Sequence, residues 1–96
     1  MPKFYVHVSL FEATPEQGQK FDEIMSNFHY LKSIKEGDEL YRLPPGGYVI
    51  NSNVDCDHIV SLTFSIASTA GVNAHVFACI FNKHSSLLPV DTLADF

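Results

Sequence analysis

The stretch that decides the fold is residues 4–17, which read FYVHVSLFEATPEQ. Residues 4–11 alternate apolar with mixed side chains, the two-residue period of a β-strand with one buried face. Thr14 and Gln17 then form a capping box, and Pro15 suits the first helical position, so a helix is predicted to start here. The chain therefore opens as a strand that passes into a helix within a few residues.

The two faces of this first strand differ in composition. We expect the wholly apolar face to lie under the helices and the mixed face to remain open. The apolar face carries Phe4, Val6, Val8 and Leu10, and the mixed face carries Tyr5, His7, Ser9 and Phe11. The helix that follows is expected to bury a stripe at helical spacing, made of Phe21, Ile24, Met25 and Phe28.

The second half of the chain repeats this order. Residues 55–58, which read DCDH, open a second helical stretch that ends at Gly71, and an alternating segment follows at residues 72–81. We expect Asp55 to cap this helix and Gly71 to take the left-handed position past its end. In the last strand, the set expected to meet the helices is Ala74, Val76, Ala78 and Ile80.

The middle of the chain predicts two further strands, at residues 29–35 and 39–43, before PPGG at residues 44–47 interrupts the second of them. An extended pattern resumes at residues 48–50. The whole order predicts an α+β domain of the ferredoxin-like βαββαβ plan, a four-stranded antiparallel sheet with two helices on one face.

Length and composition fit one globular domain over residues 1–96, with 46% apolar and 18% charged residues. The apolar residues of the tail at 82–96 predict docking onto the domain or onto a second copy. The start of the chain lacks the apolar run of a signal peptide, and no window reaches the ~18 apolar residues of a membrane helix. We therefore expect a cytoplasmic protein that does not enter a membrane.

The charge balance disfavours general nucleic-acid binding. Six basic residues stand against eleven acidic ones, giving a net charge of −5, whereas nucleic-acid binders normally carry a basic field. Lys32, Lys35 and Arg42 nevertheless lie close together in the sequence, with Tyr30 and Tyr41 nearby. They could face phosphates, and solvated charges that protect a sheet edge explain them equally well.

Three segments together resemble the GhoS-type antitoxin family of small ferredoxin-like proteins. They are the first strand with its helix, residues 40–48 (LYRLPPGGY), and a small-residue helix leading to a final strand. The named member of that family is an endoribonuclease. The resemblance covers most of residues 3–82 and implies RNA cleavage with little or no need for a metal, on the transcript of a toxin. The first helix departs from a basic, RNA-facing helix, because it carries Asp22 and Glu23 beside Lys20.

The candidate catalytic residues are His7 and His75, predicted on the open face of neighbouring strands. Cleavage through the 2′-hydroxyl needs a base and an acid, and two histidines supply both without a metal. Lys32 and Arg42 would hold phosphate, with Tyr41 as a further RNA-binding residue. The alternative is that both histidines are surface residues covered by a dimer partner or by the tail.

The aromatic residues expected around the histidines leave the same alternatives open. They would either stack RNA bases or form an apolar patch that joins two subunits. This set consists of Tyr5, Phe11, Phe77 and Phe81.

Acidic residues at two places suggest metal ligands but are better explained as helix-end charges. Glu12 stands alone at the end of the first strand, and residues 55–58 point in different directions at a helix start. We therefore predict no metal site and no cofactor.

Two functions remain open from the sequence. The first is a small GhoS-like protein, a sequence-specific endoribonuclease that acts as an antitoxin on a toxin mRNA. The second is a non-catalytic interaction or regulatory module that forms a homodimer through its open sheet face and binds a protein partner.

Overall fold

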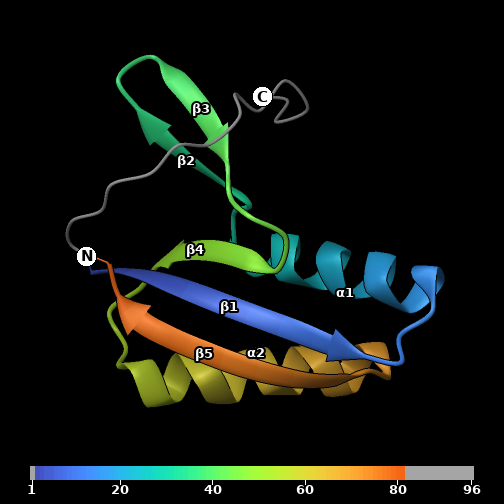
Figure 1. Ribbon diagram of the computed structural model, residues 1–96. Helices are drawn as coiled ribbons and strands as arrows, with labels where there is room; N and C mark the ends of the chain where they lie inside the picture. Colours follow the sequence, from blue (N-terminus) through green and yellow to red (C-terminus); the bar gives the residue numbers. More distant parts are fainter. Residues whose placement is uncertain (1, 82–96) are drawn as a thin grey trace.

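The computed structural model describes residues 2–81 of the 96-residue chain. The tail at residues 82–96, for which docking is predicted, lies outside the described residues. The elements follow one another as five strands and two helices (Figure 1). In chain order they are β1 (Lys3–Phe11), α1 (Pro15–Asn27), β2 (Ser33–Glu36), β3 (Glu39–Arg42), β4 (Gly47–Asn51), α2 (Cys56–Ala70) and β5 (Asn73–Ile80).

The strands form two antiparallel sheets. β1 lies at the centre of a three-stranded sheet of order β4–β1–β5, and β2 pairs with β3 in a separate two-stranded sheet. The hairpin of β2 and β3 extends away from the larger sheet (Figure 1). The mixed α+β class with antiparallel sheets is therefore confirmed, and so is the pairing of the first strand with the last.

The single four-stranded sheet expected from the sequence is not confirmed. The segment predicted as the second strand, residues 29–35, begins at His29 with a left-handed φ of 70°. Leu31 makes one antiparallel bridge to Val49, through two N–H···O bonds of 2.8 Å each. The chain then leaves this sheet, and residues 33–36 pair with residues 39–42 instead.

The local sequence explains why the middle strands separate. Gly37 takes a positive φ of 63° in the tight turn between β2 and β3, a conformation that glycine adopts without steric cost. Pro44 and Pro45 then supply no backbone N–H for a ladder. The segment predicted as one interrupted strand is therefore two strands, β3 and β4, in different sheets.

Both helix starts are capped as predicted. In α1 the Gln17 N–H donates to Thr14 Oγ1 (3.1 Å), and the Thr14 N–H donates to Gln17 Oε1 (2.9 Å). In α2 the His58 N–H donates to Asp55 Oδ1 (2.9 Å), and Gly71 ends the helix with a φ of 75°. Asp55 therefore acts as a helix cap, which confirms the interpretation of residues 55–58.

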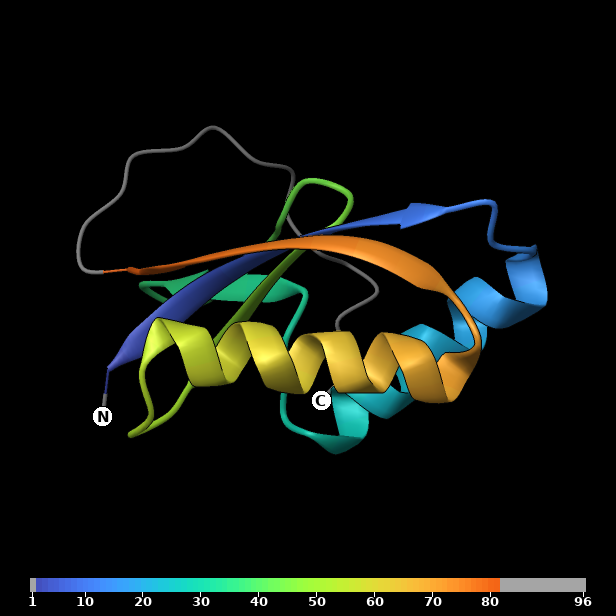
Figure 2. The ribbon, with the colours of Figure 1, turned by 90° about the horizontal axis from the view of Figure 1, so that it is seen from below.

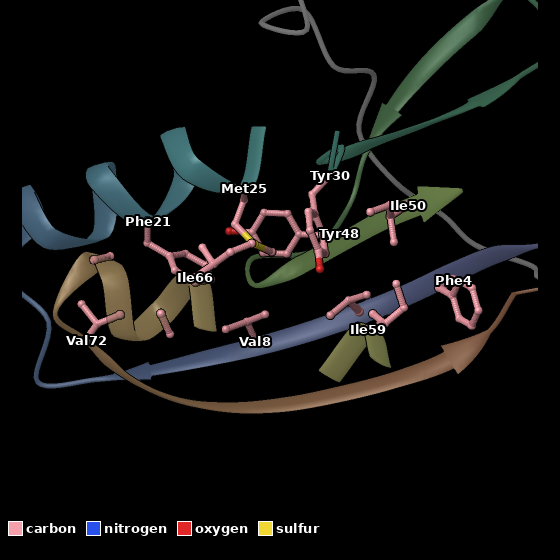
Figure 3. Packing of buried hydrophobic residues seen from close by; sticks show 13 residues of the cluster. Phe4, Val8, Phe21, Met25, Tyr30, Tyr48, Ile50, Ile59, Ile66 and Val72 are labelled. Carbon is pink, nitrogen blue, oxygen red and sulfur yellow. The ribbon is translucent and has the colours of Figure 1, made fainter. Parts of the chain in front are cut away.

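Both helices lie on the same side of the three-stranded sheet (Figure 2), and the main core fills the space between the layers (Figure 3). The apolar face of β1 lies there as predicted: Phe4, Val6 and Val8 are buried, and Leu10 packs against them. Helix α1 contributes Phe21 and Met25, and α2 contributes Ile59, Ile66, Ala67 and Ala70. The layering leaves the opposite face of β1 and β5 without a helix.

Two expected core residues lie outside the core. Phe28 is 47% exposed because α1 has already ended there and Phe28 is its C-cap. Ile80 is 56% exposed, at the last position of β5. Both predictions assumed that the buried pattern continued to the end of its element.

Within residues 2–81, no helix is both long enough and apolar enough to cross a bilayer.

Candidate functional site

The candidate site is the face of β1 and β5 that the helices leave uncovered, which we call the open face. Because side chains alternate along a strand, the odd-numbered residues of both strands share this face. The register places Tyr5 opposite Cys79, His7 opposite Phe77, and Ser9 opposite His75. Phe11 lies at one end of the face and Phe81 at the other.

The structure places His7 and His75 on this face, on neighbouring strands, as the sequence predicts. They are diagonal neighbours, because His7 pairs with Phe77 and His75 pairs with Ser9. No hydrogen bond joins the two imidazoles. A proton shuttle between them would need a substrate atom to lie between the two rings.

Each imidazole packs against a different aromatic ring. The His75 ring meets Phe11 edge-on, with 4.3 Å between centroids. The His7 ring lies 6.4 Å from that of Tyr5, and His7 Nδ1 is 3.3 Å from Tyr5 Oη. These contacts run in opposite directions along β1, so they draw the two imidazoles apart rather than together.

Tyr5 is the residue that sequence reasoning undervalued at this site. Its pKa is raised above the ordinary value of 10.0, first by burial and then by the nearby Cys79. The phenol therefore keeps its proton at neutral pH and can donate it in the hydrogen bond to His7 Nδ1. Tyr5 is thus the side chain that lies within hydrogen-bond distance of His7 Nδ1.

The hairpin covers part of the sheet on the β4 side. Ile34, Leu43 and Val49 form a second buried cluster, and Tyr5 and Tyr41 pack against it. Tyr41, predicted to bind RNA, thus serves in part to hold the hairpin to the sheet. The uncovered part of the open face is limited to β1 and β5.

This uncovered part mixes polar side chains with exposed aromatic ones. Phe77 is 65% exposed in the middle of β5, and Phe11 is 40% exposed at the end of β1. The register separates the two rings by four residues, with His75 between them. Exposed apolar side chains on one face are a feature of surfaces that bind other molecules.

Lys32 and Arg42 lie in a different place, a groove of about 580 Å³ between α1, the end of β1 and the loop of residues 43–46. The groove includes Val8 and Leu10, which belong to the helix-facing side of β1. Its lining, as far as the structure describes the chain, contains no histidine. Lys32 and Arg42 are therefore brought together in this groove. The ring of His7 borders it at Gly46, where an added Cβ would lie 3.2 Å from His7 Cε1, whereas His75 does not reach it.

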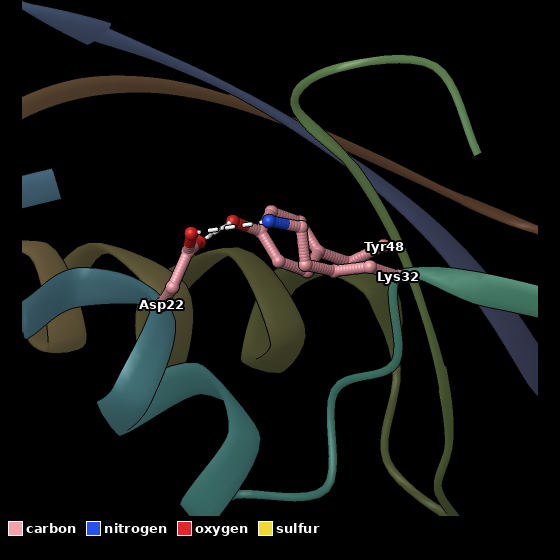
Figure 4. A network of polar contacts seen from close by, with 3 residues as sticks. All are labelled: Asp22, Lys32 and Tyr48. Atoms are coloured by element: carbon pink, nitrogen blue, oxygen red, sulfur yellow. Dashed lines mark hydrogen bonds and ion pairs between the residues drawn. The ribbon is translucent and has the colours of Figure 1, made fainter. Parts of the chain in front are cut away.

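Asp22 organises one wall of this groove (Figure 4). Its Oδ2 accepts a hydrogen bond from Lys32 Nζ (3.1 Å), and its Oδ1 accepts one from the Tyr48 hydroxyl (2.5 Å). Burial raises the pKa of Tyr48 far above its ordinary value, and the hydrogen bond and charge of Asp22 raise it further. Because Asp22 balances the charge of Lys32, this wall attracts phosphate less than the sequence suggested.

The loop at residues 44–47 is held to β1 at close range. Gly46 has a φ of 86°, its carbonyl accepts from the Val8 N–H (2.8 Å), and a Cβ at Gly46 would lie 2.6 Å from the Val8 oxygen. No larger residue fits without moving the backbone. The sequence signal was the Gly-Gly pair, whose close approach to β1 could be seen only in three dimensions.

The acidic candidates do not gather. Glu12 is exposed at the end of β1, and Asp55 caps α2. Among the side chains of the described part of the chain, no three His, Cys, Asp or Glu residues come together as a metal site.

The uncharacterized protein YmfI of Escherichia coli (strain K12) is 50% identical to this chain over 94 residues, which is 97% of the chain and 83% of YmfI. Identity of this extent over nearly the whole chain shows common descent. The chain belongs to the YmfI family. No family profile matches it, and no solved structure matches it.

Proposed function

We propose that this member of the YmfI family is a non-catalytic interaction module of the cytoplasm. In this proposal the chain forms a homodimer, and its open sheet face binds a protein partner. The observation that carries the proposal is the exposure of Phe77 and Phe11 on a face without a helix. Completely burying a fully exposed phenylalanine contributes about 1.5–3 kcal/mol, and burying these two partly exposed rings contributes a part of that for each. The acidic balance, −5 overall, fits a protein partner better than a nucleic acid.

The ferredoxin-like plan is part of this proposal. The two strand–helix units and the central position of β1 support it. The Leu31–Val49 bridge lies beside β4, where the fourth strand of that plan would pair. In this proposal the outer strand next to β4, which comes second in the chain, is shortened to the single bridge at Leu31. Residues 33–42 are then a hairpin inserted directly after it.

A second candidate is the GhoS-like endoribonuclease that acts as an antitoxin on a toxin mRNA. The observation that favours it is the placement of His7 and His75 on one face of adjacent strands. Two observations weigh against it. Neither histidine lines the groove that holds Lys32 and Arg42, and Asp22 already pairs with Lys32.

One experiment separates the two candidates. The full chain is incubated with a mixed RNA pool, with and without EDTA, beside a His7→Ala/His75→Ala double variant. His58→Ala is the matched control, because His58 lies exposed in the first turn of α2, away from the open face.

We expect no cleavage by any of these proteins and a stable dimer in solution. Cleavage lost in the double variant and kept in His58→Ala would establish the endoribonuclease and overturn the interaction module. Cleavage that persists in both would overturn the interaction module and the assignment of His7 and His75 together.

A further inference from the structure

β5 forms an edge of the three-stranded sheet, and no other strand within residues 2–81 pairs with its outer side. The Phe81 N–H donates to the Lys3 carbonyl (2.7 Å), at the end of the continuous register between β1 and β5. In an antiparallel ladder, the residues that bond to the neighbour alternate with those that do not. The N–H and C=O groups of Ala74, Val76, Ala78 and Ile80 therefore point outward, available to another strand.

This edge lacks the features that normally block pairing. Edge strands are usually protected by charged side chains, prolines or bulges. From His58 to Phe81 the chain has no Asp, Glu, Lys, Arg or Pro, and the register of β5 against β1 has no interruption. Within residues 2–81, therefore, this eight-residue strand carries none of these protections.

Apolar side chains flank the edge on both sides of the sheet. Phe77 projects on the open face, and Phe64 of α2 is 56% exposed on the helix side. Phe64 borders a shallow hollow of about 550 Å³ between α2 and the edge, which also includes Val60 and Val76. A strand added here would bury apolar surface above and below the new hydrogen bonds.

We infer that a second copy of this chain pairs its β5 antiparallel with this β5, joining two three-stranded sheets into one continuous sheet. This inference rests on the proposed function and specifies where the homodimer forms, namely the sheet edge rather than face against face. In the dimer the two open faces become neighbouring parts of one larger surface, which stays accessible to a protein partner.

Three observations favour a second copy as the occupant. An antiparallel pair of identical strands has a two-fold axis, so each outward donor meets an acceptor of the other copy. Two acidic chains of net charge −5 repel each other least where neither carries a charge, and β5 with most of α2 is such a surface. Growth stops at two copies because a two-fold pair uses the same β5 edge of both copies and leaves neither of these edges free.

Two edge variants and one face variant test this inference. Ala78→Pro removes an outward N–H and leaves the bonds to β1 intact, and Phe64→Lys places a charge beside the edge on the exposed side of α2. Phe11→Lys is the face variant: Phe11 lies on the open face of the central strand β1, where its ring packs against His75 of β5, and it takes no part in hydrogen bonds at the outer edge. Circular dichroism and thermal unfolding verify that each variant is folded. If Ala78→Pro does not fold, Phe64→Lys alone tests the edge.

Sedimentation equilibrium of the full chain gives the dissociation constant of the dimer. We expect the wild type and Phe11→Lys to dimerise alike, and each edge variant to weaken the dimer at least about tenfold, the effect of losing about 1.4 kcal/mol. A monomeric wild type overturns the inference. So does a dimer that the edge variants leave unchanged.

Amide hydrogen exchange identifies the occupant of the edge. The N–H groups of Val76 and Ala78 should be protected at high protein concentration and exchange on dilution, whereas those of Phe77 and Cys79, bonded to β1, stay protected throughout. Protection of Val76 and Ala78 that does not depend on concentration would mean that the chain covers its own edge, and would overturn the inference.

The outcomes for the inference and for the proposed function are distinct. A dimer dissociated by Phe11→Lys and not by the edge variants keeps the interaction module and overturns pairing at the edge. RNA cleavage that requires His7 and His75 overturns the interaction module whatever the oligomeric state.

Discussion

At the scale of single residues, Tyr48 joins the core to the groove. Its ring is buried beside Phe21 and Tyr30, while its hydroxyl reaches Asp22 at the groove wall. Its pKa is raised, so the folded state keeps the phenol proton at pH values where the unfolded chain loses it. The contribution of Tyr48 to the free energy of unfolding is therefore complete below the ordinary tyrosine pKa of 10.0. It decreases as pH rises above that value, because the unfolded chain then releases the phenol proton.

We therefore expect Tyr48→Phe to cost about 1–2 kcal/mol at neutral pH, through loss of a hydrogen bond to a carboxylate. Above about pH 10 the wild type should lose stability faster than Tyr48→Phe, so that the difference between them shrinks. Urea unfolding of both proteins from about pH 7 to pH 11 measures this. A difference that grows with pH would contradict the assigned role of the hydroxyl.

Two glycines should respond in opposite directions to alanine. Gly46→Ala meets both a left-handed φ of 86° and the Val8 carbonyl, and we expect a loss of about 1–3 kcal/mol. Gly18→Ala is the matched control in α1, where an added Cβ has no atom within 4 Å. It should gain about 0.5–1 kcal/mol through helix propensity. Equal effects in urea unfolding would refute the argument for the loop at residues 44–47.

At the scale of elements, the hairpin of β2 and β3 is the part that sequence patterns could not place. Its cluster of Ile34, Leu43 and Val49 is separate from the main core. We expect Ile34→Ala to loosen the hairpin through local opening, with faster amide exchange at residues 33–42 and little change in β1. Its matched control, Phe21→Ala in the main core, should cost about 3–5 kcal/mol and lower protection throughout. Uniform loss of protection in Ile34→Ala would mean that hairpin and core unfold together.

The helices and strands also show which structural features can be predicted from the sequence. Helix starts and strand faces were predicted correctly, because capping residues and alternation act over a few neighbouring positions, as at Thr14 and Asp55. Sheet membership is predicted correctly for the first and last strands but not for the middle strands, because pairing depends on partners distant in the sequence. The same holds for the candidate site. Alternation along the strands predicts the face on which His7 and His75 lie. It could not predict the contact of Lys32 with Asp22, because these residues belong to separate parts of the fold.

At the scale of the whole molecule, the response of association to salt distinguishes the two candidate functions. Two copies with a net charge of −5 each repel one another, and salt screens this repulsion over a Debye length of about 10 Å at 0.1 M. Because the proposed interface contains no Asp, Glu, Lys or Arg, salt weakens the repulsion between the two acidic copies and there is no ion pair across the interface for it to weaken. We expect the dimer to tighten severalfold between about 20 and 500 mM NaCl, as measured by sedimentation equilibrium. RNA binding would respond in the opposite sense, because added salt weakens contacts with phosphate. A dimer that weakens steadily with salt would show that ion pairs hold it, and such an interface cannot be the uncharged edge of β5.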